Sequence, residues 1–100
     1  MKYKVIVSDK ASEMLQRHIA FIANVSKKSA IDKKKEIVDA IKKLKEDANI
    51  YPFFENEFIQ KNKYHKYVIS KRYIILYQIK DNIVYVDYII DTRQDYNGLL

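Results

Sequence analysis

The sequence contains no cysteine and has only one glycine and one proline. Without cysteine there is no disulfide, no thiolate zinc site and no cysteine nucleophile. The scarcity of glycine and proline leaves little room for a flexible linker or a glycine-rich phosphate loop. No apolar run approaches the roughly 20 residues that a membrane span needs, and the charged residues 1–10 do not resemble a signal peptide. We therefore expect a cytoplasmic protein with no membrane partner.

The composition is that of a folded and basic protein. Hydrophobic residues make up 48% and charged residues 32% of the 100 residues, which fits one globular domain over residues 1–100. The formal net charge is +6, and a basic balance favours anionic partners, either nucleic acid or an acidic protein surface. The alternative is that the lysines simply solvate helix faces, and the sequence leaves it open.

The first half of the chain is mainly helical in its periodicity. Residues 3–7 alternate as a short strand, and Ser8 can cap a helix that continues to about residue 25. After a break at residues 26–29, a second apolar stripe at helical spacing predicts a helix over residues 30–48. Because the connection is so short, the two helices are expected to form an antiparallel hairpin.

The second half of the chain has the periodicity of strands. Residues 49–57 are irregular, and residues 91–100 form a short tail. Between them, tight turns connect three predicted strands at residues 64–69, 72–79 and 83–90, which implies an antiparallel meander. The predicted fold class is therefore α+β in the order β-α-α-β-β-β, with the helical hairpin packed on one face of an antiparallel sheet. The other face is expected to stay open and basic, and to carry the function.

Two segments give the chain a resemblance to a known family. The first is HKYVISKRYIILY (residues 65–77), which has an aromatic–basic pair, alternating apolar residues, a turn, and two tyrosines separated by three apolar positions. The second is VYVDYIIDTRQDY (residues 84–96), which ends in Arg-x-Asp-Tyr. Together with the order of the elements, these segments resemble the RelE/ParE toxins of type II toxin–antitoxin systems over essentially the whole chain.

This resemblance implies a growth-inhibiting toxin whose partner is a cognate antitoxin. RelE-like members cut messenger RNA in the ribosome, whereas ParE-like members inhibit DNA gyrase and are not known as nucleases. A homodimer is a further option. No cofactor is expected, and no metal site either, because the two histidines and the scattered carboxylates do not form a ligand cluster.

The resemblance also implies which residues a nuclease of this family would use. The position of the arginine early in the central strand is Ile74, which cannot stabilise phosphate charge. Arg72 precedes it by two residues and is expected on the same face, because strand side chains alternate. His65 is the candidate acid or base near neutral pH. Arg93 is a candidate phosphate ligand, and Tyr96 a candidate proton donor or stacking residue.

Each of these candidates has a purely structural alternative. His65 can form a hydrogen bond at the rim of the sheet, Arg93 can pair with a neighbouring aspartate, and Tyr96 can cap the sheet edge. His18 lies on the apolar face of the first predicted helix and is expected to be a packed residue at the edge of the core.

Two further groups of residues are expected to bind partners. Cations are the candidate contacts for RNA or for a protein target, and the two arginines among them are expected to be exposed: Lys63, Lys66, Arg72 and Arg93. Apolar residues are the candidate anchors for an acidic antitoxin segment, unless the phenylalanines plug the sheet edge instead: Phe53, Phe54, Phe58, Leu99 and Leu100. Because Ile74 replaces the arginine, ParE-like inhibition of gyrase is favoured over RelE-like cleavage of mRNA in the ribosome. A non-toxic basic binding module is the third option.

Overall fold

The computed structural model describes residues 2–55, 57 and 59–93, and its elements follow the predicted order. A short 3-10 turn between the second helix and the second strand is the one addition. The elements along the chain are β1 (Lys4–Val7), α1 (Asp9–Ala23), α2 (Lys27–Asp47), η1 (Ala48–Ile50), β2 (His65–Ile69), β3 (Tyr73–Lys80) and β4 (Ile83–Asp91).

Serine caps set where both helices begin. The Ser8 hydroxyl accepts a hydrogen bond from the Ala11 backbone N–H at 3.0 Å, which satisfies one of the free donors in the first turn of α1. The Ser26 hydroxyl does the same for the Ser29 N–H at 3.2 Å. Because Ser26 is the cap, α2 begins earlier than the residue 30 that the apolar stripe alone predicts.

The sheet is mixed, with the strand order β1-β4-β3-β2. The predicted antiparallel meander of β2, β3 and β4 is confirmed. The first strand pairs with β4 in parallel, with Val5 opposite Val84, so the sheet as a whole is not purely antiparallel. The position of β1 at an edge of the sheet follows from the meander, because β3 already has a neighbour on each side.

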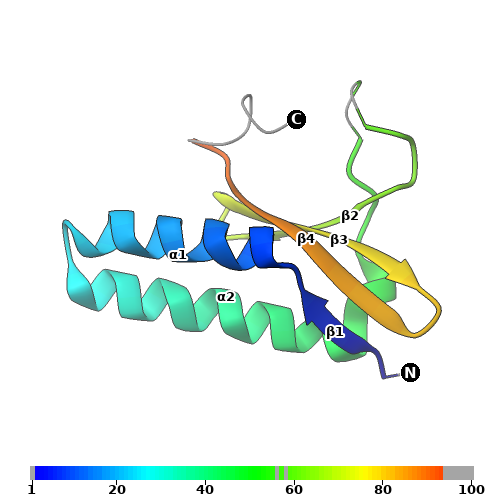
Figure 1. The fold of residues 1–100 in the computed structure, drawn as a ribbon, viewed down its shortest axis with the longest axis horizontal. Helices are drawn as coiled ribbons and strands as arrows, with labels where there is room; N and C mark the ends of the chain where they lie inside the picture. Colours follow the sequence, from blue (N-terminus) through cyan, green and yellow to red (C-terminus); the bar gives the residue numbers. More distant parts are fainter. Residues whose placement is uncertain (1, 56, 58, 94–100) are drawn as a thin grey trace.

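Both helices lie on the same face of the sheet, as predicted, and Figure 1 shows them side by side and extending beyond the strands at one end. The core of this face joins the inner sides of the helices to alternate strand residues, among them Ile37, Leu44, Ile75 and Val86. Tyr77 is fully buried there and donates a hydrogen bond from its hydroxyl to the Ala48 carbonyl oxygen at 2.6 Å. This core fixes the helical hairpin on the sheet.

The opposite face, called here the far face, is not bare. A second apolar cluster covers its centre, and its buried members are Met14, Phe54, Tyr64, Ile74, Leu76 and Ile90. Part of the cover comes from the segment between η1 and β2, which we call the covering segment (the described residues from 53 to 64). The prediction of an open basic face is therefore wrong, because apolar residues of the irregular segment fold back over the sheet.

Backbone hydrogen bonds join the two ends of the covering segment to each other and the residue before it to the outer edge of β2. The Phe54 N–H donates to the Tyr64 carbonyl oxygen at 2.6 Å, and the Lys66 N–H donates to the Pro52 carbonyl oxygen at 2.8 Å. Phe53 also forms an isolated antiparallel bridge with His65. These contacts protect the first part of an edge strand that would otherwise be free to pair. In the part of the chain that is described, no helix is long and apolar enough to cross a membrane.

Candidate functional site

His65 lies on the helix-covered face, in a stack of aromatic rings. Its ring is 4.2 Å from that of Phe53 and 5.3 Å from that of Tyr77, centroid to centroid. The Nδ1–H donates a hydrogen bond to the Tyr51 carbonyl oxygen at 2.8 Å, because a carbonyl can only accept. The imidazole thus contacts two aromatic rings and has one nitrogen in a hydrogen bond, which agrees with the structural alternative for this residue.

Arg72 is held by a buried carboxylate. Its Nε and Nη2 atoms lie 3.4 Å and 3.3 Å from the two carboxylate oxygens of Asp91, which is 2% exposed. The guanidinium also lies 5.4 Å from the centre of the Tyr73 ring. The Arg72 side chain is only 28% exposed. The expectation of an exposed cation is therefore wrong for Arg72, since this ion pair ties the turn before β3 to the end of β4.

Arg93 stands in a different position from Arg72. Its backbone N–H donates a hydrogen bond to Asp91 at 2.9 Å, while the residue itself is exposed. The aspartate thus contacts the main chain of one arginine and the side chain of the other. The exposure of Arg93 is as predicted.

Ile74 is 7% exposed and belongs to the apolar cluster of the far face. The side chain at this position therefore packs in the core of the far face. The candidates Lys63 and Lys66 lie outside this cluster. Lys63 is exposed, with its ammonium 5.4 Å from the Tyr64 ring, and Lys66 is half-buried. Of the described candidates, His65 lies on the helix-covered face, whereas Lys66 and Ile74 lie on the far face.

The two phenylalanines described in the covering segment have different roles. Phe54 is 3% exposed, so it is a core residue and cannot serve as an open anchor for a partner. Phe53 is 40% exposed and remains available. The other candidate anchors, Phe58, Leu99 and Leu100, lie outside the described residues, as does Tyr96.

His18 is a core residue, as predicted. It is 3% exposed and donates a hydrogen bond from Nε2 to the Ile89 carbonyl oxygen at 2.9 Å. Its ring also lies 5.9 Å from that of Tyr73. The residue joins α1 to β4 and has no access to a substrate.

Sequence reasoning missed a polar cluster at the bulge between β3 and β4. The register shifts between Leu76 and Tyr77, and Asp87 is the extra residue on β4. Its carboxylate accepts hydrogen bonds from the Tyr64 hydroxyl at 3.0 Å and from Gln78 Nε2 at 2.7 Å. Burial, followed by the hydrogen bond to Asp87, raises the pKa of Tyr64 above its ordinary value. Tyr64 is thus a neutral hydrogen-bond donor that fixes the end of the covering segment.

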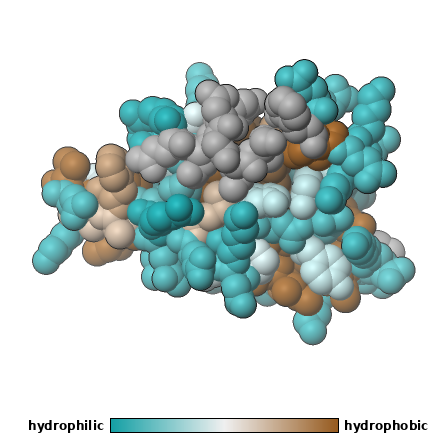
Figure 2. All heavy atoms as spheres, turned by 45° about the horizontal axis from the view of Figure 1, so that its top comes forward, coloured by the Kyte–Doolittle hydropathy of each residue, from teal (hydrophilic) through white to brown (hydrophobic). Residues whose placement is uncertain are grey.

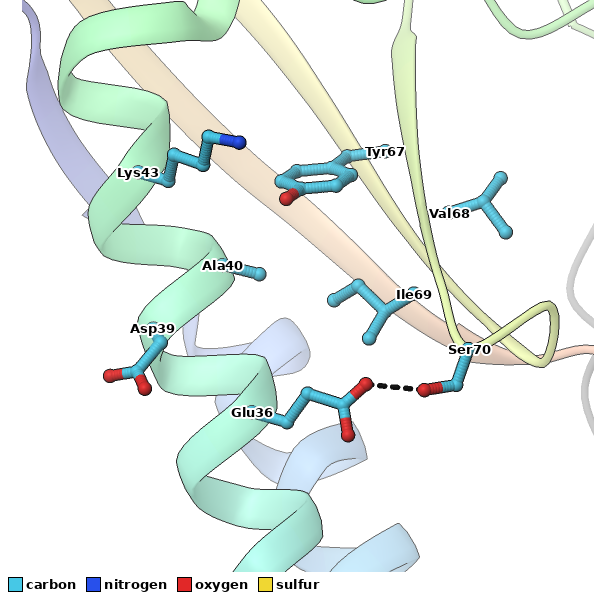
Figure 3. Close-up of a pocket in the computed structure, with 8 residues that line it drawn as sticks. All are labelled: Glu36, Asp39, Ala40, Lys43, Tyr67, Val68, Ile69 and Ser70. Carbon is cyan, nitrogen blue, oxygen red and sulfur yellow. Dashed lines mark hydrogen bonds between the residues drawn. The ribbon is translucent and has the colours of Figure 1, made fainter.

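Sequence reasoning also missed a groove of about 400 Å³ between α2 and β2. In Figure 3 the Tyr67 and Ile69 side chains point from β2 toward α2, whereas Val68 points away from it. One end of the groove is closed by hydrogen bonds that join Glu36 of α2 to the Ser70 hydroxyl and to Lys33. These contacts lower the pKa of Glu36, the largest cause being Ser70. The groove lies beside the edge of β2 that faces away from β3. On that edge, no described backbone group forms a hydrogen bond with Val68.

Within the described ranges, no group of three or more His, Cys, Asp or Glu side chains is placed to hold a metal ion. The described surface has exposed cations, a groove lined by both apolar and charged side chains, and a partly open strand edge. Such features suit binding to a macromolecule.

Comparison with known proteins identifies the family. The model of the ParE toxin of the type II toxin–antitoxin system parDE matches residues 5–96. The chain belongs to the ParE toxin family. A solved structure described as the chromosomal ParDE toxin–antitoxin system from P. aeruginosa is similar to it, with a TM-score of 0.73 and 14% sequence identity, covering 90% of this chain and 96% of the other. No match was found among curated proteins.

Membership in the ParE toxin family confirms the RelE/ParE resemblance and the identification as a type II toxin. The similar solved structure shares the α+β fold, with two helices on a four-stranded mixed sheet.

Proposed function

We propose that this ParE-family toxin arrests growth by inhibiting DNA gyrase in the cytoplasm, without cutting RNA. The observation that carries the proposal is that the positions a nuclease would use have structural contacts instead. Ile74 packs in the far-face cluster, Arg72 is paired with Asp91, and His65 is in contact with two aromatic rings.

RNA cleavage requires a group that assists attack by the 2′-hydroxyl and a cation that stabilises the charge on the phosphate in the transition state. The Nε and Nη2 atoms of Arg72 contact the buried Asp91 carboxylate, so using these atoms to bind that phosphate would break the ion pair at a cost in stability. His65 would have to act from a stack on the helix-covered face, whereas Lys66 points to the far face. These separations argue against a shared nuclease site.

The other cations among the candidate residues support binding to an acidic protein surface. Lys63 and Arg93 are exposed, and Lys66 is half-buried. They are the proposed contacts with the target, and their contribution should weaken with added salt because exposed charges are screened.

The partner that silences the toxin is proposed to be an antitoxin with an acidic, partly disordered segment. The exposed Phe53 is its proposed apolar anchor. The groove between α2 and β2, which is lined by Lys43 but also by Glu36 and Asp39, is the proposed site for its uncharged residues. An extended segment could add to the β2 edge beyond Lys66, where the described residues place no backbone hydrogen bond on Val68 from the side away from β3.

The test is a supercoiling assay with purified gyrase, relaxed plasmid and purified toxin, run beside a translation reaction in which transcript ends are mapped. We expect loss of supercoiling at toxin concentrations that leave transcripts intact. The matched pair is Arg93→Glu, which should weaken inhibition, and Lys28→Glu on the exposed side of α2, which should not. Transcript cuts that depend on the ribosome, with normal supercoiling, would instead establish the RelE-like activity.

A further inference from the structure

The far face has a second half, beyond Leu76, that the apolar cluster around Ile74 does not reach. Its residues come from the neighbouring strands β1, β4 and β3, and none of them belongs to that cluster. We call this surface the distal platform, and its residues are Lys4, Ile6, Gln78, Lys80, Ile83 and Tyr85. The two lysines are exposed, Ile6 is 38% exposed, and the others are half-buried.

Alternation along each strand puts the residues of the distal platform on one face. Val84 and Val86, on either side of Tyr85, are fully buried in the core under the helices. Because successive strand side chains point to opposite faces, Tyr85 points to the far face. The same argument applies to β1 and β3, since Val5 and Tyr77 pack on the helix side. The platform is therefore one continuous surface.

The register of the strands arranges the platform in two rows. In the first row, Lys4 lies opposite Ile83, which in turn lies opposite Lys80. Two strand spacings, about 10 Å, separate the backbones of the two lysines. The second row is uncharged and has an aromatic residue at its centre: Ile6, Tyr85 and Gln78. An aromatic ring on an inner strand thus lies beside a row that has a cation at each end.

The charge of the platform is positive. Among the residues that the structure describes, no carboxylate forms an ion pair within 4.0 Å of Lys4 or Lys80. Asp87, at the inner border of the platform, accepts two hydrogen bonds that partly compensate its charge, and Asp81 is exposed in the turn. Figure 2 shows hydrophilic side chains around paler and hydrophobic patches at the right-hand end of the molecule, toward the turn between β3 and β4.

We propose that the distal platform binds single-stranded nucleic acid. Its two lysines contact phosphates, and Tyr85 stacks on a base. A duplex keeps its bases paired and stacked inside, where a sheet face does not reach them. A peptide is a poorer match, because the common modes of peptide binding use a strand edge or a groove, and the face of a sheet offers neither. Charge complementarity and the aromatic ring together select this ligand.

The proposal does not depend on the gyrase assignment, because none of the platform residues is a proposed contact with gyrase. The probe is a fluorescein-labelled oligothymidine of about 12 nucleotides, within the range that single-strand platforms cover. Binding is measured by fluorescence anisotropy at low salt, and the melting temperature of each variant verifies its fold. The same strand in a duplex with oligodeoxyadenosine is the control, and an oligouridine of equal length compares RNA with DNA.

The single and double variants separate stacking from charge. Tyr85→Leu removes the aromatic ring and should weaken binding about 10-fold, whereas Tyr85→Phe keeps the ring and should change the affinity by less than about 2-fold. The double variant Lys4→Glu/Lys80→Glu should weaken binding by about 10-fold or more and reduce its salt dependence. The matched double variant Lys28→Glu/Lys43→Glu has the same net charge and should cost less than about 3-fold. Both oligonucleotides should lose affinity in Tyr85→Leu, and the tighter of the two identifies the natural ligand as DNA or RNA.

Any of four results would overturn the proposal. The duplex could bind as tightly as the single strand, or the two Tyr85 variants could bind the probe equally. The two double variants could lose the same affinity, which would leave only the net charge of the protein as the cause. Displacement of the probe by an equal charge concentration of polyglutamate would instead identify the platform as a contact for an acidic protein.

Discussion

The two faces of the sheet are both apolar at their centres, but different structures cover them. On one face, α1 and α2 bury residues such as Ile75 and Val86 under regular helices. On the far face, Leu76 and Ile90 lie under Met14 and an irregular segment that contributes Phe54 and Tyr64. An irregular cover has fewer cooperative backbone bonds and opens at lower free energy than packed helices. The comparison teaches that a face without helices is not necessarily open to a substrate.

Two neighbouring residues of β3 provide the largest test of this difference. Ile75 and Leu76 are both fully buried, on opposite faces of the sheet. We expect Ile75→Ala to lower the free energy of unfolding by about 4 kcal/mol and Leu76→Ala by about 2.5 kcal/mol, because the loop can collapse into a cavity more easily than helices can. Chemical denaturation of both variants measures the difference, and equal losses would mean that the two covers are equally rigid.

Replacing Arg72 or Arg93, the two arginines that contact Asp91 at the end of β4, should have a smaller effect on stability. Arg72→Ala removes a guanidinium from the buried Asp91 carboxylate, and we expect a loss of about 2 kcal/mol in unfolding free energy. Arg93→Ala removes only an exposed side chain and should change stability by less than about 0.5 kcal/mol. Thermal melts of both variants at one salt concentration make the comparison. A neutral Arg72→Ala would show that this arginine is available for a ligand.

The hydrogen bond between Tyr64 and Asp87 should contribute still less to the free energy of unfolding. Tyr64→Phe keeps the ring in its apolar site but removes the hydrogen bond to Asp87. Its expected effect is a loss of about 1 kcal/mol in unfolding free energy and faster amide exchange in the covering segment. If exchange accelerates equally in α2, Tyr64 supports the whole fold and not the segment alone.

A rise to alkaline pH should produce the smallest and most gradual loss of stability. Burial, helped by the neighbouring Tyr67, raises the pKa of Tyr51 to about 12. A raised pKa in the folded state means that the stabilising contribution is complete below the ordinary tyrosine value of about 10 and is lost as the pH rises toward 12. Replacing Tyr51 by Phe should reduce the pH dependence of stability in this window. An unchanged slope would assign the effect to other tyrosines.

Local sequence patterns predicted the elements but not all of their long-range partners. The serine cap of α1, the helical hairpin and the meander depend on residues that are close in sequence, and the structure has them. The parallel pairing of β1 with β4 joins distant residues, and no periodicity records such a partner. The burial of Phe54 is a similar case, because apolar residues in an irregular segment do not reveal which surface they will cover.

The candidate site was predictable by residue type, but the contacts of those residues were not. His65, Arg72 and Arg93 share the side-chain chemistry of catalytic groups, yet only their surroundings decide whether that chemistry is free. The Asp91 carboxylate is offset from Arg72 by 19 positions and pairs with it only because β3 and β4 are in register. The distal platform likewise depends on the parallel pairing of β1 with β4.

The central claim is that the far face is closed over Ile74, and the absence of cysteine in the chain allows a direct test. Single cysteines are placed at Ile74 and at its cross-strand neighbour Val68, which are 7% and 46% exposed, and their reaction with a soluble thiol reagent is timed. Ile74→Cys should react at least about 100-fold more slowly than Val68→Cys, since its labelling requires local opening of the cover. Equal rates in two folded variants would contradict the account and restore an open face to which RNA has access.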